Sequence, residues 1–267
     1  MYDFEYMKPG SVAEAVAALQ SEEATAMSGG QSLLPTMKAR LAQHEKVVDL
    51  TGCLGDDIRV ERDGDLFIGG GTRHVAVSKH DFVPAWLADV AAHIGDPAVR
   101  NRGTIGGSLA NNDPAACYPA AVLAAGAKIH TNTRTIAADD YFQGMFTTAL
   151  EEGEVITQVE FNVGLTDPGR VEAANYQKFV QPASRFALVG VCVAKTASGV
   201  RVAVTGASEN GVYRWSDAEA ALSANFSPDA VPAAPSADGM LGDIHGTPEY
   251  RAHIVHVMTK RAVAACA

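Results

Sequence analysis

Two glycine-rich segments hold the residues best suited to bind an anion. The first spans residues 27–35 (MSGGQSLLP) and the second spans residues 104–114 (TIGGSLANNDP). Each places a Gly-Gly pair before hydroxyl or amide side chains and an apolar run. Because glycine adopts positive φ angles and lets a ligand approach the backbone, successive N–H groups can converge on an anion. Two such segments in one chain predict a single long, diphosphate-containing ligand held from two sides.

Each segment taken alone also has a purely structural interpretation. The first fits a tight turn between a strand and a helix, and the second fits a loop packed closely against another part of the backbone. Their joint occurrence, with hydroxyl and amide side chains following both glycine pairs, favours anion binding.

Other chemistry-bearing patterns are weaker. Residues 69–72 (GGGT) lack the G-x-G-x-x-G spacing of a dinucleotide-binding turn, so a structural turn is favoured. His253 and His256 have no further metal ligands nearby in the sequence and are interpreted as surface histidines. Asp139 and Asp140 are adjacent and face different ways on a helix, so a capping or solvated role is expected. No Ser/His/Asp or Cys/His arrangement is recognisable, because the serines of the glycine segments lack a base or a nucleophile elbow.

Composition narrows the class of protein further. The chain has 267 residues and a formal net charge of −10, which argues against nucleic-acid binding. The acidic start lacks the features of a signal peptide, and no run of about eighteen apolar residues predicts a membrane span. The four cysteines are scattered, which argues against a zinc ribbon or an iron–sulfur cradle and fits a reducing cytoplasm.

The first glycine segment needs a strand before it and a helix after it. A strand is predicted at 24–27 and a helix at 33–41, with Pro35 in its first turn, where proline is tolerated. A helix beginning at the capping box Ser11-x-x-Glu14 and a strand at 47–50 complete a small α/β unit. This unit is assigned to residues 1–55.

The second glycine segment lies within a longer region with hairpins, assigned to residues 56–167. Asp63-Gly64 predicts a hairpin between strands at 58–61 and 66–68. Further elements complete a mixed arrangement typical of the α+β class. They are helices at 75–80, 85–93 and 115–126, a hairpin of strands at 128–130 and 134–136, and a strand at 155–163.

A third region, residues 168–267, is predicted to hold an antiparallel sheet covered by helices. Its strands are expected at 176–180, 188–195 and 200–205, with a turn at Ser198-Gly199. A second capping box, Ser216-x-x-Glu219, predicts a helix at 216–223, and a terminal helix is expected at 250–265.

At this point the residues resemble a known family. SGGQSLLP at 28–35 and RNRGTIGGSLANNDPAA at 100–116 are similar to the two flavin-binding motifs of the FAD-binding medium subunits of molybdenum hydroxylases. This family includes carbon monoxide dehydrogenase and xanthine dehydrogenase. The resemblance extends over nearly the whole chain, including the GEVI segment at 153–156, and is greatest to the carbon monoxide dehydrogenase form. It implies a PCMH-type FAD-binding domain of two α/β subdomains, followed by a C-terminal antiparallel sheet-and-helix domain.

The resemblance also implies which residues contact FAD. Residues 28–33 are expected to surround the diphosphate with backbone amides, and the second motif is expected to hold the diphosphate and ribityl region. Ile105 and Ile156 are expected against ring systems, with Asp113 and Lys178 as polar contacts. The full set is Met27, Ser28, Gly29, Gly30, Gln31, Ser32, Leu33, Thr104, Ile105, Gly106, Gly107, Ser108, Asp113, Cys117, Ile156 and Lys178.

Two positions depart from the family pattern. Cys117 stands where relatives commonly carry an aspartate, so FAD binding here is expected either to depend more on Asp113 or to lose the local contact. Asp96 stands where many relatives have histidine, and the sequence suggests no function for that change.

The function implied is electron transfer, with no catalytic residue and no metal ligand on this chain. A large molybdopterin subunit and a small [2Fe–2S] subunit are the implied partners, in a dimer of heterotrimers. Electrons are expected to pass from the clusters through FAD to quinone, NAD or oxygen, in the cytoplasm or at the inner face of the membrane. Two alternatives stay open: a stand-alone FAD-dependent oxidoreductase of the same fold, and a scaffold that has lost its flavin.

Overall fold

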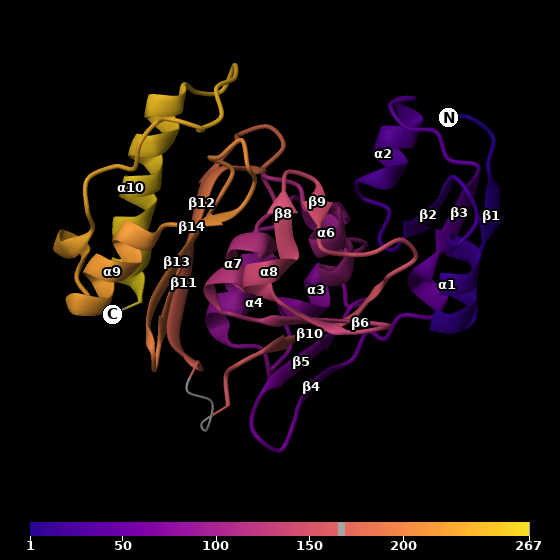
Figure 1. The fold of residues 1–267 in the computed structure, drawn as a ribbon, viewed down its shortest axis with the longest axis horizontal. Coiled ribbons are helices and arrows are strands. Elements are labelled where there is room, and N and C mark those ends of the chain that lie inside the picture. Colours follow the sequence, from indigo (N-terminus) through magenta and orange to yellow (C-terminus); the bar gives the residue numbers. More distant parts are fainter. Residues whose placement is uncertain (165–168, 267) are drawn as a thin grey trace.

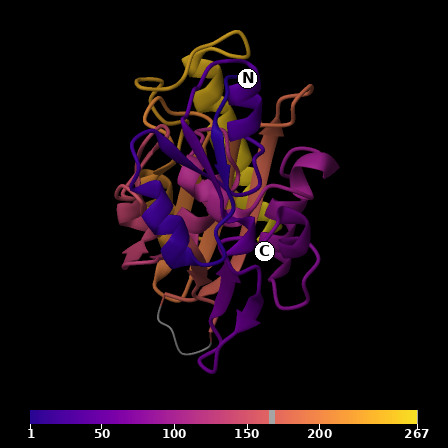
Figure 2. The same ribbon diagram turned by 90° about the vertical axis from the view of Figure 1, so that its right-hand side faces the viewer.

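The computed structural model describes residues 1–164 and 169–266, and its first layer is a small parallel sheet. The strand order is β1-β3-β2. Figure 2 shows this N-terminal unit in front of the rest of the molecule. Its own core is small, since it consists of Ala15, Leu19, Val48 and Leu50 together with Val155 from the neighbouring region. The elements are β1 (Glu5–Met7), α1 (Val12–Leu19), β2 (Ala24–Met27), α2 (Leu33–Lys38), β3 (Lys46–Asp49) and the 3-10 turn η1 (Leu50–Gly52).

The central region is built on a five-stranded antiparallel sheet in the order β4-β5-β10-β6-β7. Helices pack against it around the largest core of the described chain, and a small hairpin, β8–β9, projects beside them (Figure 1). The strands are β4 (Ile58–Val60), β5 (Leu66–Gly69), β6 (Lys128–Thr131), β7 (Thr135–Ala137), β8 (Phe142–Gly144), β9 (Thr147–Thr148) and β10 (Ile156–Phe161). The helices are α3 (His74–Val77), α4 (Ala85–Ala92), α5 (Pro97–Arg100), α6 (Ile105–Asn111), α7 (Tyr118–Ala124) and α8 (Ala138–Tyr141).

The C-terminal region is a four-stranded antiparallel sheet in the order β11-β12-β13-β14 that is buried on both faces. Alternate residues of β12 show why: Cys192 and Ala194 belong to the central core, whereas Val191 and Val193 pack under α9 and α10. In Figure 1 this sheet stands between the central region and the two helices. The elements are β11 (Val171–Val180), β12 (Ala187–Thr196), β13 (Gly199–Thr205), β14 (Tyr213–Arg214), α9 (Ser216–Ala224), η2 (Pro228–Ala230) and α10 (Pro248–Ala265).

This α+β architecture agrees with the predicted fold class, and the three main sheets fall within the ranges 1–55, 56–167 and 168–267. The division into three domains stays a prediction, because the boundary between residues 167 and 168 lies outside the described residues. The central core also continues into the C-terminal sheet.

Most local predictions are confirmed. The side chain of Ser11 accepts a hydrogen bond from the Glu14 N–H at 3.2 Å, as a capping box requires. The carboxylate of Glu14 reaches back one residue further than expected, to the N–H of Gly10 at 2.8 Å. The hairpin at Asp63-Gly64 forms between β4 and β5, with Gly64 at φ +93°.

Three local predictions are wrong, each for a physical reason. The capping box at Ser216 does not form, because Glu219 instead accepts bonds from Arg214 and from the N–H of Val202. The helix expected from residue 115 begins only at Tyr118, because Asp113 holds the preceding residues in a turn. The second glycine segment is not a loop: its Gly-Gly pair lies in the first turn of α6.

None of the helices in the described ranges is long and apolar enough to cross a membrane. Within the same ranges, no group of three or more His, Cys, Asp or Glu side chains is arranged to hold a metal ion.

Candidate functional site

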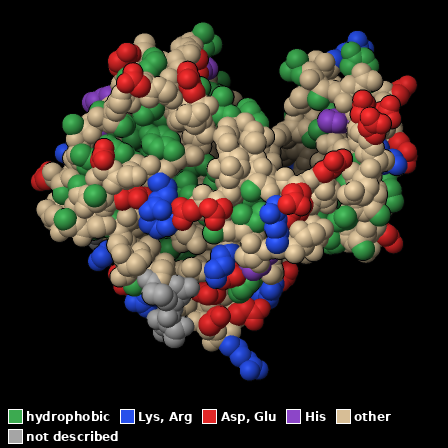
Figure 3. All heavy atoms as spheres, viewed as in Figure 1, with side chains coloured by type: hydrophobic (Ala, Val, Ile, Leu, Met, Phe, Trp, Pro, Cys, Tyr) green, Lys and Arg blue, Asp and Glu red, His purple; other side chains and the backbone are tan. Residues whose placement is uncertain are grey.

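A cleft of about 880 Å³ runs between the N-terminal unit and the rest of the chain. Figure 3 shows the molecule hollowed at this place. The volume lies within the range of about 300–1,000 Å³ that is typical of small-molecule and cofactor sites. All of the predicted contact residues line it except Ile105, so the fold brings together residues from all three regions.

The first glycine segment forms the loop between β2 and α2 and leaves its backbone donors unpaired. Gly30 adopts φ +69°, a conformation that favours glycine. Among the described residues, nothing accepts a hydrogen bond from the N–H groups of residues 29–32. Four successive free N–H donors on a cleft wall form the kind of backbone site that binds an anionic ligand.

The second glycine segment has the opposite property, because its backbone donors are already used. The N–H groups of Ile105 and Gly106 donate to the carbonyls of Thr72 and Gly70, both at 3.0 Å. Gly107 donates to Oγ1 of Thr104 at 3.1 Å, and Ser108 donates to the Thr104 carbonyl at 3.0 Å. This segment therefore presents side chains to the cleft, such as the hydroxyl of Ser108, rather than backbone amides.

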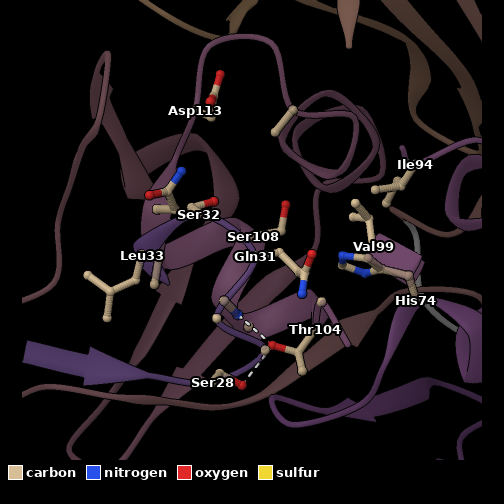
Figure 4. A pocket seen from close by; sticks show the side chains of 18 of the residues that line it. Ser28, Gln31, Ser32, Leu33, His74, Ile94, Val99, Thr104, Ser108 and Asp113 are labelled. Carbon is tan, nitrogen blue, oxygen red and sulfur yellow. Dashed lines mark hydrogen bonds between the residues drawn. The ribbon is translucent and has the colours of Figure 1, made fainter. Parts of the chain in front are cut away.

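The two segments also pack directly against each other. A Cβ on Gly29 would stand 2.2 Å from the carbonyl oxygen of Arg102, so only glycine fits there. The hydroxyls of Ser28 and Thr104 are 2.9 Å apart and hydrogen-bonded, as the dashed line in Figure 4 shows. Both interpretations of the glycine pairs therefore apply. Close packing depends on the missing Cβ atoms, whereas ligand binding depends on the free N–H groups and the hydroxyl side chains.

The third glycine run, residues 69–72, is a structural turn and does not line the cleft. A Cβ on Gly69 would meet the carbonyl oxygen of Gly55 at 2.3 Å, and one on Gly70 would meet that of Ile156 at 2.3 Å. Ile105 also lies outside the cleft, because its side chain is fully buried in the central core. This position does not suit the predicted contact between Ile105 and a ring system.

The C-terminal sheet supplies the opposite wall of the cleft. Lys178 of β11 lines the cleft, and its Nζ donates to the carbonyl of His93 at 3.0 Å. The segment after β11 adds Arg185, at φ +64°, and Phe186, an aromatic ring that the sequence did not single out. Cys117 also lines the cleft and is buried at the start of α7.

The structure gives Asp96 a local role. Its side chain caps α5 by accepting a hydrogen bond from the Val99 N–H at 2.9 Å, and Val99 lines the cleft. At residue 96 the departure from the family pattern therefore places a helix cap beside the cleft wall.

Glu154 braces the cleft wall between Leu150 and Ile156. Its side chain is only 2% exposed and accepts bonds from Arg134 and Thr131, among others. Burial alone would raise the pKa of this carboxyl, but the hydrogen bonds outweigh it and hold the pKa at about 2. Glu154 is therefore a charged, fully bonded support.

Several lining residues lay beyond sequence reasoning. They come from single positions with no motif of their own, so only their place in the fold reveals them. They include Leu54, His74, Ile94, Val99, Arg185 and Phe186.

Comparisons with known proteins identify the family. A family model described as the FAD binding domain in molybdopterin dehydrogenase matches residues 2–161. The nicotine 6-hydroxylase medium subunit of Paenarthrobacter nicotinovorans is 35% identical over 97% of this chain and 95% of its own. The carbon monoxide dehydrogenase medium chain of Afipia carboxidovorans is 33% identical, with the same 97% and 95% coverage.

A solved structure gives the same result. A chain of carbon monoxide dehydrogenase from Hydrogenophaga pseudoflava superimposes with a TM-score of 0.88 at 33% identity, covering 99% of this chain and 97% of its own. The protein therefore belongs to the family of FAD-binding subunits of molybdopterin dehydrogenases. It is a medium-type oxidoreductase subunit, and FAD is its cofactor.

Proposed function

We propose that this chain passes electrons from the [2Fe–2S] clusters of a small partner subunit, through its own FAD, to an external acceptor. Substrate oxidation would take place on a large molybdopterin subunit, within a dimer of heterotrimers in the cytoplasm or at the inner face of the membrane. Quinone, NAD and oxygen all suit the role of acceptor. The single observation that carries the proposal is the cleft whose first glycine loop offers four unpaired N–H groups.

The donor set of the cleft suits the parts of FAD. The free N–H groups of residues 29–32 would hold the diphosphate, with α2 beginning directly after them. Ser108 and Asp113 would hold polar groups of the ribityl region, although one oxygen of Asp113 already accepts the Ala115 N–H at 2.8 Å. Ile156 and Phe186 offer apolar surface to the ring system.

When bound, FAD supplies the electron-accepting and electron-donating chemistry, and the chain's own residues bind and orient it. The relatives named as medium subunits of larger dehydrogenases support a role within a complex over a stand-alone oxidoreductase.

Lys178 is the residue through which the protein would tune the flavin. Its ammonium lies on the cleft wall, held by the His93 carbonyl. A positive charge near the ring stabilises an anionic reduced flavin and raises its potential. Lys178→Met should lower the flavin midpoint potential, measured by a spectroscopic redox titration. Lys195→Met, outside the cleft, is the control, and an unchanged potential in Lys178→Met would refute this role.

The whole proposal is tested by reconstitution. The purified chain is titrated with FAD and then combined with the candidate large and small subunits. We expect stoichiometric flavin absorbance and flavin reduction that requires the iron–sulfur subunit. Failure to bind FAD would favour the scaffold alternative, and substrate-dependent flavin reduction by the isolated chain would favour the stand-alone enzyme.

A further inference from the structure

His74 is a polar residue of the cleft wall that neither glycine segment explains. It is the first residue of α3, is only 4% exposed, and lines the cleft near Ile94 and Val99. In Figure 4 its imidazole points from α3 toward the space that Gln31 and Ser108 also face.

The imidazole has no hydrogen-bond partner within the described chain. Its Nδ1 is buried and unpaired, and the edge that carries Nε2 lies over Gly103. A Cβ at residue 103 would stand 2.5 Å from Nε2, so the glycine keeps the space that the ring occupies. An unpaired buried polar group costs about 1–3 kcal/mol. The site therefore carries a ring whose hydrogen-bonding capacity is unused by the protein itself.

The surroundings keep this ring uncharged. Burial, together with the positive charge of Arg100, lowers the pKa of His74 to about 4. Arg100 donates to the carbonyls of Ile94 and Gly95, both at 3.0 Å, so it also fixes the neighbouring wall. A neutral imidazole has one donor and one acceptor nitrogen. It can bond a neutral or anionic group of a cofactor without adding charge.

We propose that His74 is a cofactor-binding residue whose imidazole hydrogen-bonds the FAD held in this cleft. The inference rests on the FAD site described above and adds a contact that the two glycine motifs do not supply. The bound cofactor provides the partner that the ring lacks. The Tyr118 ring, 5.4 Å away and with its own hydroxyl unpaired, packs behind the imidazole and limits its movement.

The test compares two substitutions in the full-length chain. His74→Phe keeps a ring but removes both nitrogens, whereas His74→Gln keeps a donor and an acceptor. We expect FAD affinity, measured by quenching of flavin fluorescence, to fall about tenfold in His74→Phe and about threefold or less in His74→Gln. His253→Phe, which changes an exposed histidine on α10, should bind FAD as the unsubstituted chain does.

A second measurement does not depend on the variants folding. In the ¹⁵N-histidine-labelled chain, the ring nitrogen resonances of His74 should shift when FAD is added. Unchanged resonances, or equal FAD affinity in a folded His74→Phe variant, would overturn the inference while leaving FAD binding intact. An unsubstituted chain that binds no FAD would overturn both this inference and the proposed function.

Discussion

The two glycine segments look alike in sequence but contribute different atoms to the site. The loop after β2 leaves the N–H groups of residues 29–32 free. The start of α6 uses the N–H groups of residues 105–108 within the protein, through Thr72, Gly70 and Thr104. A Gly-Gly pair can thus leave backbone N–H groups free for a ligand, or it can let the backbone pack closely against another segment that accepts those hydrogen bonds. The difference is set by what lies behind each segment, and not by the pair itself.

The largest effect is expected where both roles meet, at Gly29. In Gly29→Ala the new methyl group would stand 2.2 Å from the Arg102 carbonyl oxygen, so the two segments must separate. We expect FAD binding to be lost and the thermal midpoint to fall, measured by flavin titration and by differential scanning calorimetry.

Gly10→Ala is the matched control. A Cβ there would meet only the Glu14 carboxylate at 3.6 Å, an ordinary contact, so both measurements should stay unchanged. If Gly29→Ala bound FAD normally, the interlocking of the two segments would be unnecessary for the site.

Glu154 tests whether the wall beside both segments depends on charge. Because its pKa falls from 4.5 unfolded to about 2 folded, its ionised form stabilises the fold above about pH 4.5, and that stability is lost as the pH falls toward 2. Glu154→Gln should reduce the free energy of unfolding at pH 7 by about 2 kcal/mol.

Urea denaturation at several pH values measures this effect. The difference between Glu154→Gln and the unsubstituted chain should shrink as the pH drops through the same window. Glu152→Gln, an exposed neighbour, serves as the control. A pH-independent difference would rule out the ionised carboxylate as the source.

A substitution at Thr104 tests two roles of this side chain, which caps α6 and hydrogen-bonds Ser28 of the first glycine segment. Thr104→Val removes the cap on α6 and the bond to Ser28, at a cost of about 1–2 kcal/mol. Thr247→Val removes the comparable cap on α10, and Thr247 does not line the cleft. Both variants should melt earlier, but only Thr104→Val should also bind FAD more weakly. Equal FAD binding in both would mean that the Ser28 contact does not shape the site.

The smallest effects should distinguish side-chain contacts from backbone contacts. Ser108→Ala removes a hydroxyl from the segment that offers side chains, so FAD affinity should fall about three- to tenfold in a calorimetric titration. Gln31→Ala changes a side chain in the segment that offers backbone donors and should have less effect. The reverse order would contradict the contrast between the two segments.

The sequence predicts local features of the fold well, because they depend on neighbouring residues. The Ser11 cap and the Asp63-Gly64 turn are examples, and the strand–loop–helix around Gly30 is another. Such local patterns do not indicate which residues far apart in the sequence come into contact. Nothing near Gly29 indicates that Arg102 lies against it, and nothing near Ile105 indicates that its side chain faces the core. The sequence does not single out His74 for the same reason, because only the folded chain shows that this histidine lines the cleft.

The small core of the N-terminal unit has a consequence for its resistance to proteolysis. Few apolar side chains hold this unit together, and its loop contacts the central region through the close backbone approach at Gly29 and the Ser28–Thr104 hydrogen bond. Because FAD would contact both this unit and the central region, its binding should stabilise their packing in proportion to its occupancy. We therefore expect the N-terminal unit to resist proteolysis better in the flavin-loaded chain than in the flavin-free chain.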